Sequence, residues 1–513
     1  MSKTPSDKLF QLIHSLTGPE RRYVSVHLNR QANHSDNKYL LLFQTASAQK
    51  VMDESSLRKK IYGKTQITSR KFSELKAYTY HLILTALQFY DGSTSINFKV
   101  DTQLQQIRVL FKRSHYRDCL DLLKKSKTLI IKYELFLQLI AVLDWEKKIA
   151  YAREDIAFLD EELQRIDEEE QACVAQIRNL STYRNILYQL IISRRKYAVL
   201  RSTEKQKKLA EILEHPLLAK PEKARSYRAS VLYYRIQSNG AYSMLDYEKF
   251  YKFSRGQIDL MEANPHLLKE DISAYIYGMT NLMLACGLLS RYKELESNLL
   301  IFRELKGSSI DDAFRIFKHF YALSFRLCIQ KGDFAEGWKM LERHFEELDK
   351  YKGQSFERGS FYFQYFYLSF GKENYDDALS YLNLWLNLPR SIEREDLQSL
   401  ARMLNLILHY EMNNMVLLES LVKNTHRYLK RRNQAYAFEK HLLHFFQQVI
   451  KNNYRTSLKA ALKVLKNDFT ALAEHPSEKV MLQYFDFLSW IEGKITRQPF
   501  AKVVAANYQR SDE

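Results

Sequence analysis

Apolar side chains recur along most of this 513-residue chain at the three- and four-residue intervals of amphipathic α-helices. Residues 7–16 carry one such face, and residues 67–90 continue the pattern over a longer stretch. The apolar positions are Leu9, Leu12, Ile13 and Leu16 in the first segment and Phe72, Leu75, Tyr78, Leu82, Ile83 and Leu87 in the second. The pattern predicts a short helix at 7–16 and a long helix at 67–90.

Local start and stop signals predict three further helices between these two. Thr17-Gly-Pro-Glu20 has the spacing of a capping box, in which the Glu20 side chain reaches back to the Thr17 amide at the start of a helix at about 18–30. Asp36 can cap the next helix, and a third is expected from Ser55 to about Gly63. The run Asp91-Gly-Ser-Thr-Ser95 is the predicted end of an N-terminal module, residues 1–94.

A longer repeat follows beyond residue 97. A large apolar residue flanked by turn-forming and charged residues returns at Tyr292, Phe334, Tyr375, Met415 and Tyr454, with spacings of 42, 41, 40 and 39 residues. The series extends backward with less regularity through Tyr247, Tyr197, Ala157 and Tyr116. This period is typical of helical hairpins that bury their apolar faces by stacking on one another. We therefore predict an all-α fold, with a right-handed superhelical solenoid of hairpins at 97–495 and a C-terminal cap and frayed tail at 496–513.

Composition supports a well-packed helical protein. Gly at 14 and Pro at 8 are scarce, so tight strand connections are few, and 46% of residues are apolar. The four cysteines, Cys119, Cys173, Cys286 and Cys328, lie far apart in apolar helical contexts and are expected to be buried thiols in a reducing compartment. The N-terminus has no apolar leader, and the uncharged stretch 272–290 is expected to be a buried repeat helix. We expect a cytoplasmic protein without a membrane span.

The formal charge of +18 is distributed unevenly. Residues 1–100 contain 15 Lys and Arg against 7 Asp and Glu, and residues 401–513 contain 17 against 10. Residues 251–400 contain 19 against 22 and are slightly acidic. Basic ends favour acidic partners, although long solvated helices also need many Lys and Arg.

Residues 372–385 resemble a tetratricopeptide repeat. Asn374-Tyr-Asp-Asp-Ala378 is similar to the turn and small residue that open the second helix of that repeat, and Lys331-Gly-Asp-Phe334 repeats the turn. In this register the large packing positions fall on Tyr362 and Tyr365, on Leu382 and Trp385, and on Tyr321, with Pro389 near the terminal proline. Phe325 and Phe366 replace the usual small residue, and the period exceeds the 34 residues of that family. The opening residues also resemble the N-termini of helical-repeat proteins from Bacteroidota, a likeness that supplies no activity.

Motifs that would carry chemistry are incomplete. Gly63-Lys64-Thr65 copies the end of a phosphate-binding loop, but Arg58 stands where the first glycine is needed and the preceding segment is predicted to be helical. His441 and His444 lie one helical turn apart, where core or groove histidines are favoured over a metal site. The aromatic run 360–370 is expected to form helix–helix core. We therefore predict no catalytic residue, no cofactor and no metal.

The predicted function is that of a non-enzymatic scaffold or adaptor. The first helices of stacked hairpins line a concave surface that can bind a protein or peptide partner, with Tyr, Asn and Arg supplying the contacts. The candidate partner-binding residues are Tyr362, Tyr365, Asn281, Tyr321, His441 and His444. The alternative is a regulator whose basic N-terminal module contacts nucleic acid through Arg58, Lys59, Lys60, Lys64, Arg70 and Lys71 while its repeats sense a peptide or protein. The partner, the oligomeric state and the biological process are not encoded in any motif.

Overall fold

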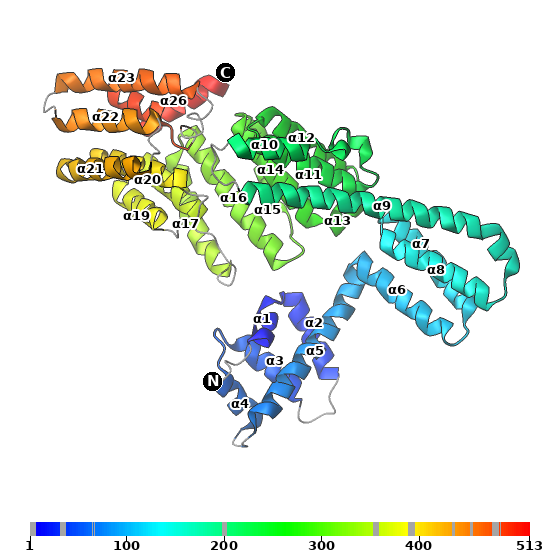
Figure 1. Cartoon of the computed structure of the whole chain (residues 1–513). Coiled ribbons are helices and arrows are strands. Elements are labelled where there is room, and N and C mark those ends of the chain that lie inside the picture. Colours follow the sequence, from blue (N-terminus) through cyan, green and yellow to red (C-terminus); the bar gives the residue numbers. More distant parts are fainter. Residues whose placement is uncertain are drawn as a thin grey trace. The chain divides into compact units, whose positions relative to one another are not determined.

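The chain is built of α-helices that pack in neighbouring pairs (Figure 1). The computed structural model describes residues 7–30, 37–63, 65, 67–196, 203–351, 359–387, 395–432, 437–451, 455–474, 482 and 484–512. No β-strand occurs among these residues, so the predicted all-α class is confirmed. In the same ranges no helix is long and apolar enough to cross a membrane.

Contacts between residues divide the chain into two compact units. The first unit contains residues 1–181 with two short later pieces, Arg225–Tyr227 and Asn264–Asp271. The second contains Thr182–Ala224, Arg228–Ala263 and Ile272–Glu513. The division falls within one long helix, and each unit is described separately below.

The first unit begins with a small bundle that has its own core. Its helices are α1 (Lys8–Ser15), α2 (Gly18–Arg30), α3 (Lys38–Ala48), α4 (Glu54–Tyr62) and α5 (Ser69–Thr94). Helices α1, α2 and α3 all contact α5, the long helix of this bundle (Figure 1). Buried apolar residues such as Ile13, Val24, Leu42 and Phe72 fill the space between them. Residues 9–86 thus form a continuous core of their own, and the module predicted at 1–94 stays a prediction.

Helix ends in this bundle follow the local signals with one correction. The Thr17 amide donates to Glu20 Oε2 at 2.7 Å, and the Glu20 amide lies 3.4 Å from Thr17 Oγ1, which confirms the capping box. The cap expected from Asp36 is made instead by Asn37, whose side chain accepts from the Leu40 amide at 2.9 Å. Asp36 itself lies outside the described residues.

The remaining helices of the first unit run from residue 96 onward. They are α6 (Ile96–Phe111), α7 (Tyr116–Lys132), α8 (Phe136–Ala152), most of α9 (Ile156–Lys196) and the short α13 (Pro265–Glu270). Helices α6, α7 and α8 lie side by side around Val100, Ile107, Leu123 and Val142 (Figure 1). Helix α9 begins at Ile156, directly after a turn at Glu154 and one residue before the weak unit predicted near Ala157. Ile166 and Cys173 face its buried side, whereas Leu163 is 51% exposed.

The second unit contains most of the helix pairs. Its elements are α10 (Thr203–Leu213), the 3₁₀ turns η1 (Pro216–Leu218) and η2 (Pro221–Lys223), α11 (Tyr227–Ser243), α12 (Tyr247–Glu262), α14 (Ile272–Leu288), α15 (Tyr292–Glu304), α16 (Ile310–Lys331), α17 (Phe334–Leu348), η3 (Asp349–Tyr351), α18 (Gly359–Gly371), α19 (Tyr375–Leu386), α20 (Glu395–Glu411), α21 (Met415–Arg432), α22 (Ala437–Lys451), α23 (Arg455–Ala473), α25 (Phe487–Thr496) and α26 (Phe500–Asp512). Helix α14 occupies the uncharged stretch 272–290 and is buried along most of its length, as predicted. The aromatic helix α18 is likewise core, and all four cysteines are buried thiols.

One type of turn joins the helices of many pairs. The residues Ser114, Glu134, Glu154, Leu245, Ser290, Gly332, Glu373 and Asn413 all have φ between 52° and 69°. In every case the next helix begins two residues later, and the residue between donates its amide hydrogen to a carbonyl five positions back. These are Schellman turns, which satisfy carbonyl groups at the helix end. The residues that recur in the sequence at Tyr292, Phe334, Tyr375 and Met415 are therefore the first residues of second helices. Tyr197 and Tyr454 lie outside the described residues.

The C-terminal helix contacts elements far back in the sequence. Phe500 packs on Phe334 with ring centroids 5.7 Å apart, and Tyr508 packs on Tyr292 at 4.9 Å. At Gly332 the backbone of α26 is so close that an added Cβ would lie 2.7 Å from the Ala505 nitrogen. Helix α26 runs from Phe500 to Asp512. It lies within residues 496–513, where the sequence predicts a C-terminal cap and a frayed tail. Stacking of successive pairs does not by itself lead to contacts across this many residues.

Candidate functional site

The basic residues of the N-terminal bundle divide into paired and exposed groups. Arg58 forms an ion pair with Glu54 at 2.7 Å, and Arg70 pairs with Glu74 at 3.0 Å on the surface. Lys59, Lys60 and Lys71 have exposed side chains. Lys64 lies outside the described residues. Arg58 therefore serves the packing of α4 on α5, and the exposed lysines form what remains of the predicted nucleic-acid surface.

The candidate tyrosines of the repeats support the core. Tyr321 and Tyr365 are 4% and 2% exposed, and the Tyr365 hydroxyl lies 2.6 Å from His344 Nε2. Tyr362 is half-buried with its ring 6.3 Å from that of Tyr365. His344 is fully buried between the rings of Phe317 and Phe361. Tyr321 and Tyr365 thus stabilise helix packing from inside, and only Tyr362 offers surface to a partner.

The two candidate histidines contact different side chains. His441 Nδ1 lies 2.8 Å from Asp468 Oδ2, and exposed His444 contacts Gln448 through Nε2 at 2.8 Å. The buried residues of α22 are their neighbours Leu442, Leu443, Phe445 and Phe446. No group of three or more His, Cys, Asp or Glu could hold a metal ion in the part of the chain that the structure describes.

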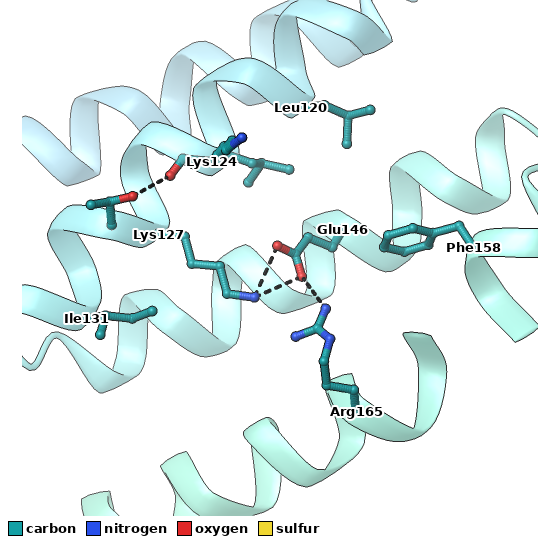
Figure 2. Close-up of a pocket in the computed structure, with 9 residues that line it drawn as sticks. Leu120, Lys124, Lys127, Ile131, Glu146, Phe158 and Arg165 are labelled. Carbon is teal, nitrogen blue, oxygen red and sulfur yellow. Dashed lines mark hydrogen bonds and ion pairs between the residues drawn. The ribbon is translucent and has the colours of Figure 1, made fainter. Parts of the chain in front are cut away.

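A pocket of about 400 Å³ opens between α7, α8 and α9 (Figure 2). Its apolar wall includes Leu120, Leu123, Ile131 and Phe158, and its polar wall includes Lys124, Lys127, Thr128, Glu146 and Arg165. Lys127 Nζ contacts both Glu146 oxygens at 3.3 Å, and Arg165 Nη2 lies 3.9 Å from Glu146 Oε2 (Figure 2).

The charges at this pocket neutralise one another. Glu169 accepts from Lys127 at 3.1 Å and from Arg165 at 2.5 Å, and Arg165 also pairs with Glu162. Burial alone would raise the pKa of Glu169, but the hydrogen bonds from Lys127 and Arg165 outweigh it and lower that pKa. The carboxylates and cations thus join α7, α8 and α9. This arrangement is typical of a structural ion-pair network.

A different arrangement occupies the first helices of three pairs in the second unit. Partly buried arginines, tyrosines and amides on α11, α14 and α16 contact one another across these helices, and we call this surface the arginine–tyrosine face. Its members are Arg235, Asn239, Tyr242, Tyr277, Asn281 and Arg326. Asn281, a predicted partner-binding residue, lies here and is 9% exposed.

Hydrogen bonds and ring contacts order the part of this face between α11 and α14. The Tyr277 hydroxyl donates to Asn239 Oδ1 at 2.8 Å, and Asn281 Nδ2 lies 3.4 Å from Ser238 Oγ. The Arg235 guanidinium lies over the Tyr277 ring, 4.0 Å from its centroid. Cation–π contact of this kind orients a guanidinium without neutralising it. Arg235 has no carboxylate partner among the described residues.

Arg326 is the residue of this face that lies on α16. Its Nε would be 3.9 Å from a Cβ on Gly287, so the Arg326 side chain lies beside α14 at that glycine. The titratable groups with the largest electrostatic effect on Arg326 are Tyr242, Tyr247, Tyr292 and Tyr484. Burial lowers the pKa of its guanidinium, because the charged form is partly removed from water.

Sequence analysis predicted Tyr, Asn and Arg contacts on first helices but did not single out Arg235 or Arg326. A signal was present for Arg326, the single Asp, Glu, Lys or Arg between Lys318 and Lys331. A lone charge within such an apolar stretch needs either a partner or a function. The absence of a carboxylate near it could be recognised only in three dimensions.

Comparison of the chain with protein-family models, with curated proteins and with solved structures finds no match. The function therefore has to be inferred from the residues of the chain itself.

Proposed function

We propose that this protein is a non-enzymatic scaffold or adaptor that binds a protein or peptide partner on the first helices of its stacked helix pairs. In this proposal the pairs form a right-handed, tetratricopeptide-like solenoid, and the arginine–tyrosine face is part of its concave surface. The observation that carries the proposal is the presence of Arg235 and Arg326 on that face without carboxylate partners in the described parts of the chain.

The recurring turn supports the architectural part of the proposal. Eight connections use the same Schellman geometry, so helices of successive pairs leave the turns in similar directions. Polar side chains of neighbouring first helices contact each other directly, as the hydrogen bond between Tyr277 on α14 and Asn239 on α11 illustrates. Extended surfaces of this kind are typical of repeat proteins that hold peptides.

The residue types on the face support the binding part. Tyrosine and arginine are enriched where proteins bind each other, because they combine a large contact area with polar groups. Asn239 and Asn281, only 6% and 9% exposed, hold the neighbouring polar side chains in place through their hydrogen bonds. No covalent chemistry is required of any residue.

Site-specific photocrosslinking tests the proposal. A benzoylphenylalanine is placed at Tyr277 on the face or, as the matched control, at Leu300, which is 70% exposed on the second helix α15. In cells that naturally produce the protein, we expect a discrete adduct from position 277 and none from position 300. Adducts from position 300 alone, or equally from both, would contradict the proposal.

The alternative is a regulator with a nucleic-acid-contacting N-terminal module. It is favoured by the exposure of Lys59, Lys60 and Lys71 and by the basic balance of residues 1–100. If it holds, the intact protein is retained on DNA or RNA at low salt, with retention falling steeply as salt rises. Replacing these three lysines by glutamine should abolish retention, whereas replacing the exposed Lys124, Lys125 and Lys459 should not. Absence of binding at low ionic strength removes this alternative.

A further inference from the structure

Most basic side chains that lie between helix pairs of the second unit have a carboxylate partner. Arg255 on α12 pairs with Glu294 on α15, and Lys331 at the end of α16 pairs with Glu296. Arg326 lies only five residues before Lys331 and differs from it. Within the described ranges its guanidinium forms neither an ion pair nor a hydrogen bond with the chain, and no Asp or Glu is among the groups with the largest effect on it.

A guanidinium without a partner lowers the stability of the fold, because a partly desolvated charge loses hydration that no neighbour replaces. The groups around Arg326 are tyrosines, which are neutral at physiological pH and can only partly compensate it. The residue as a whole is only partly buried, whereas its guanidinium is largely surrounded by protein atoms, so a partner has to reach in between these helices to contact it. Uncompensated charges of this kind are typical of binding sites, where the ligand completes the ion pair.

The charges around Arg326 indicate which kind of group would pair with its guanidinium. On the same side of α16, two turns earlier, His319 has no basic character at neutral pH because burial lowers its pKa to about 4. The nearest other cation of the face, Arg235, is already in contact with the Tyr277 ring. One guanidinium matches one carboxylate in charge and in its two-pronged geometry, whereas it would leave about half of the charge of a phosphate dianion unpaired.

We propose that Arg326 anchors a carboxylate of an acidic segment in the bound partner, with Arg235 as a second contact along the same face. The inference rests on the proposed partner-binding function and specifies the chemistry of the partner. Tyr242 lies on the same face of α11 as Arg235 and is among the groups with the largest electrostatic effect on Arg326.

Binding of a hexaglutamate peptide to the intact protein tests the anchor. We expect Arg326→Gln to weaken binding about tenfold or more, since a charge-assisted pair is lost. Arg402→Gln is the matched control, because Arg402 is also a partly buried arginine with tyrosine as a neighbour; its guanidinium lies 4.1 Å from the centroid of the Tyr428 ring. Equal affinity of Arg326→Gln and the unmodified protein would overturn the proposal, as would equal losses in both variants. Stronger competition by inorganic phosphate than by glutarate at matched ionic strength would also overturn the assignment to a carboxylate.

A stability measurement keeps the test independent of folding defects. Because Arg326 is desolvated without a partner, Arg326→Leu should raise the midpoint of thermal unfolding while hexaglutamate binding is lost. A variant that loses both stability and binding would contradict the inference, since it would show that Arg326 is a packing residue.

The two proposals fail in different ways. If crosslinking from Tyr277 persists in Arg326→Gln, partner binding at the face stands and the carboxylate anchor is wrong. If no adduct forms from Tyr277 in the unmodified protein, the proposed function itself is wrong.

Discussion

Trp490 Nε1 donates a hydrogen bond to Glu411 Oε1 at 2.7 Å, which ties α25 to a carboxylate 79 residues earlier on α20. Lys494 forms an ion pair with the other oxygen of Glu411, and the Tyr375 hydroxyl lies 3.4 Å from it. The Glu411 side chain is only 5% exposed. One carboxylate therefore connects three helices of the C-terminal core. Its contribution to the free energy of unfolding can be measured.

Replacing Glu411 by glutamine should lower the free energy of unfolding by about 2 kcal/mol, because Lys494 and Trp490 lose a charged acceptor. The matched control is Glu419→Gln, whose partner Lys423 is exposed on the same helix. That change should cost no more than about 0.5 kcal/mol. Denaturant titration of both variants measures the difference, and equal effects would show that the buried pair has no special role.

Stability should depend on the protonation of His344. Burial lowers the pKa of His344 to about 4, whereas an unfolded histidine titrates near 6.5. Between these two pKa values His344 is protonated in the unfolded chain but neutral in the folded chain. The contribution of His344 to the free energy of unfolding is therefore fully present above pH 6.5 and is lost as the pH falls. His344 should account for about 2 kcal/mol of loss between pH 7 and pH 5. His319 and His409 also have lowered pKa values and add to the total slope.

The variant His344→Phe isolates the contribution of His344 to this pH dependence, because it keeps an aromatic ring between Phe317 and Phe361. Its unfolding free energy should change less between pH 7 and pH 5 than that of the unmodified protein. An unchanged pH slope would mean that His344 becomes protonated without cost in the folded state.

The glycine in the turn between α16 and α17 should be needed for the packing of the C-terminal helix. Gly332 has φ of 69°, and a Cβ there would lie 2.7 Å from the Ala505 nitrogen and 2.8 Å from the Ala501 oxygen. Gly332→Ala should therefore cost more than about 1 kcal/mol and increase hydrogen exchange in α26. Gly92→Ala, at a position with no atom within 4 Å of the added Cβ, should be neutral or slightly stabilising. Unchanged exchange in α26 would contradict the contact.

The turn before α12 should be improved by glycine. Leu245 has φ of 62° and a side chain that is 46% exposed, so it pays for the left-handed conformation with little packing in return. Leu245→Gly should raise the free energy of unfolding by about 1 kcal/mol. Its neighbour Asp246 caps α12 by accepting from the Lys249 amide at 3.1 Å, so Asp246→Ala should lower stability by about 1 kcal/mol. The same sign for both variants in thermal unfolding would contradict this account of the turn.

Short-range signals in the sequence determined the helices and many of their ends. The Thr17–Glu20 capping box, the stop at Gly63 and the recurrence at Tyr292, Phe334, Tyr375 and Met415 all depend on a few adjacent residues. A helix end needs only local hydrogen bonds, and the side chains that supply them are neighbours in the chain. Burial of the cysteines and of α18 followed in the same way from apolar context.

Only the tertiary structure decided which of these helices meet at a distance. The burial of Tyr321 and Tyr365 around His344, and the lack of a carboxylate partner for Arg326 among the described residues, were not visible in the sequence. The return of α26 to Gly332 belongs with them. A contact between residues tens or hundreds of positions apart depends on how every helix between them packs. Patterns of a few adjacent residues do not specify that packing.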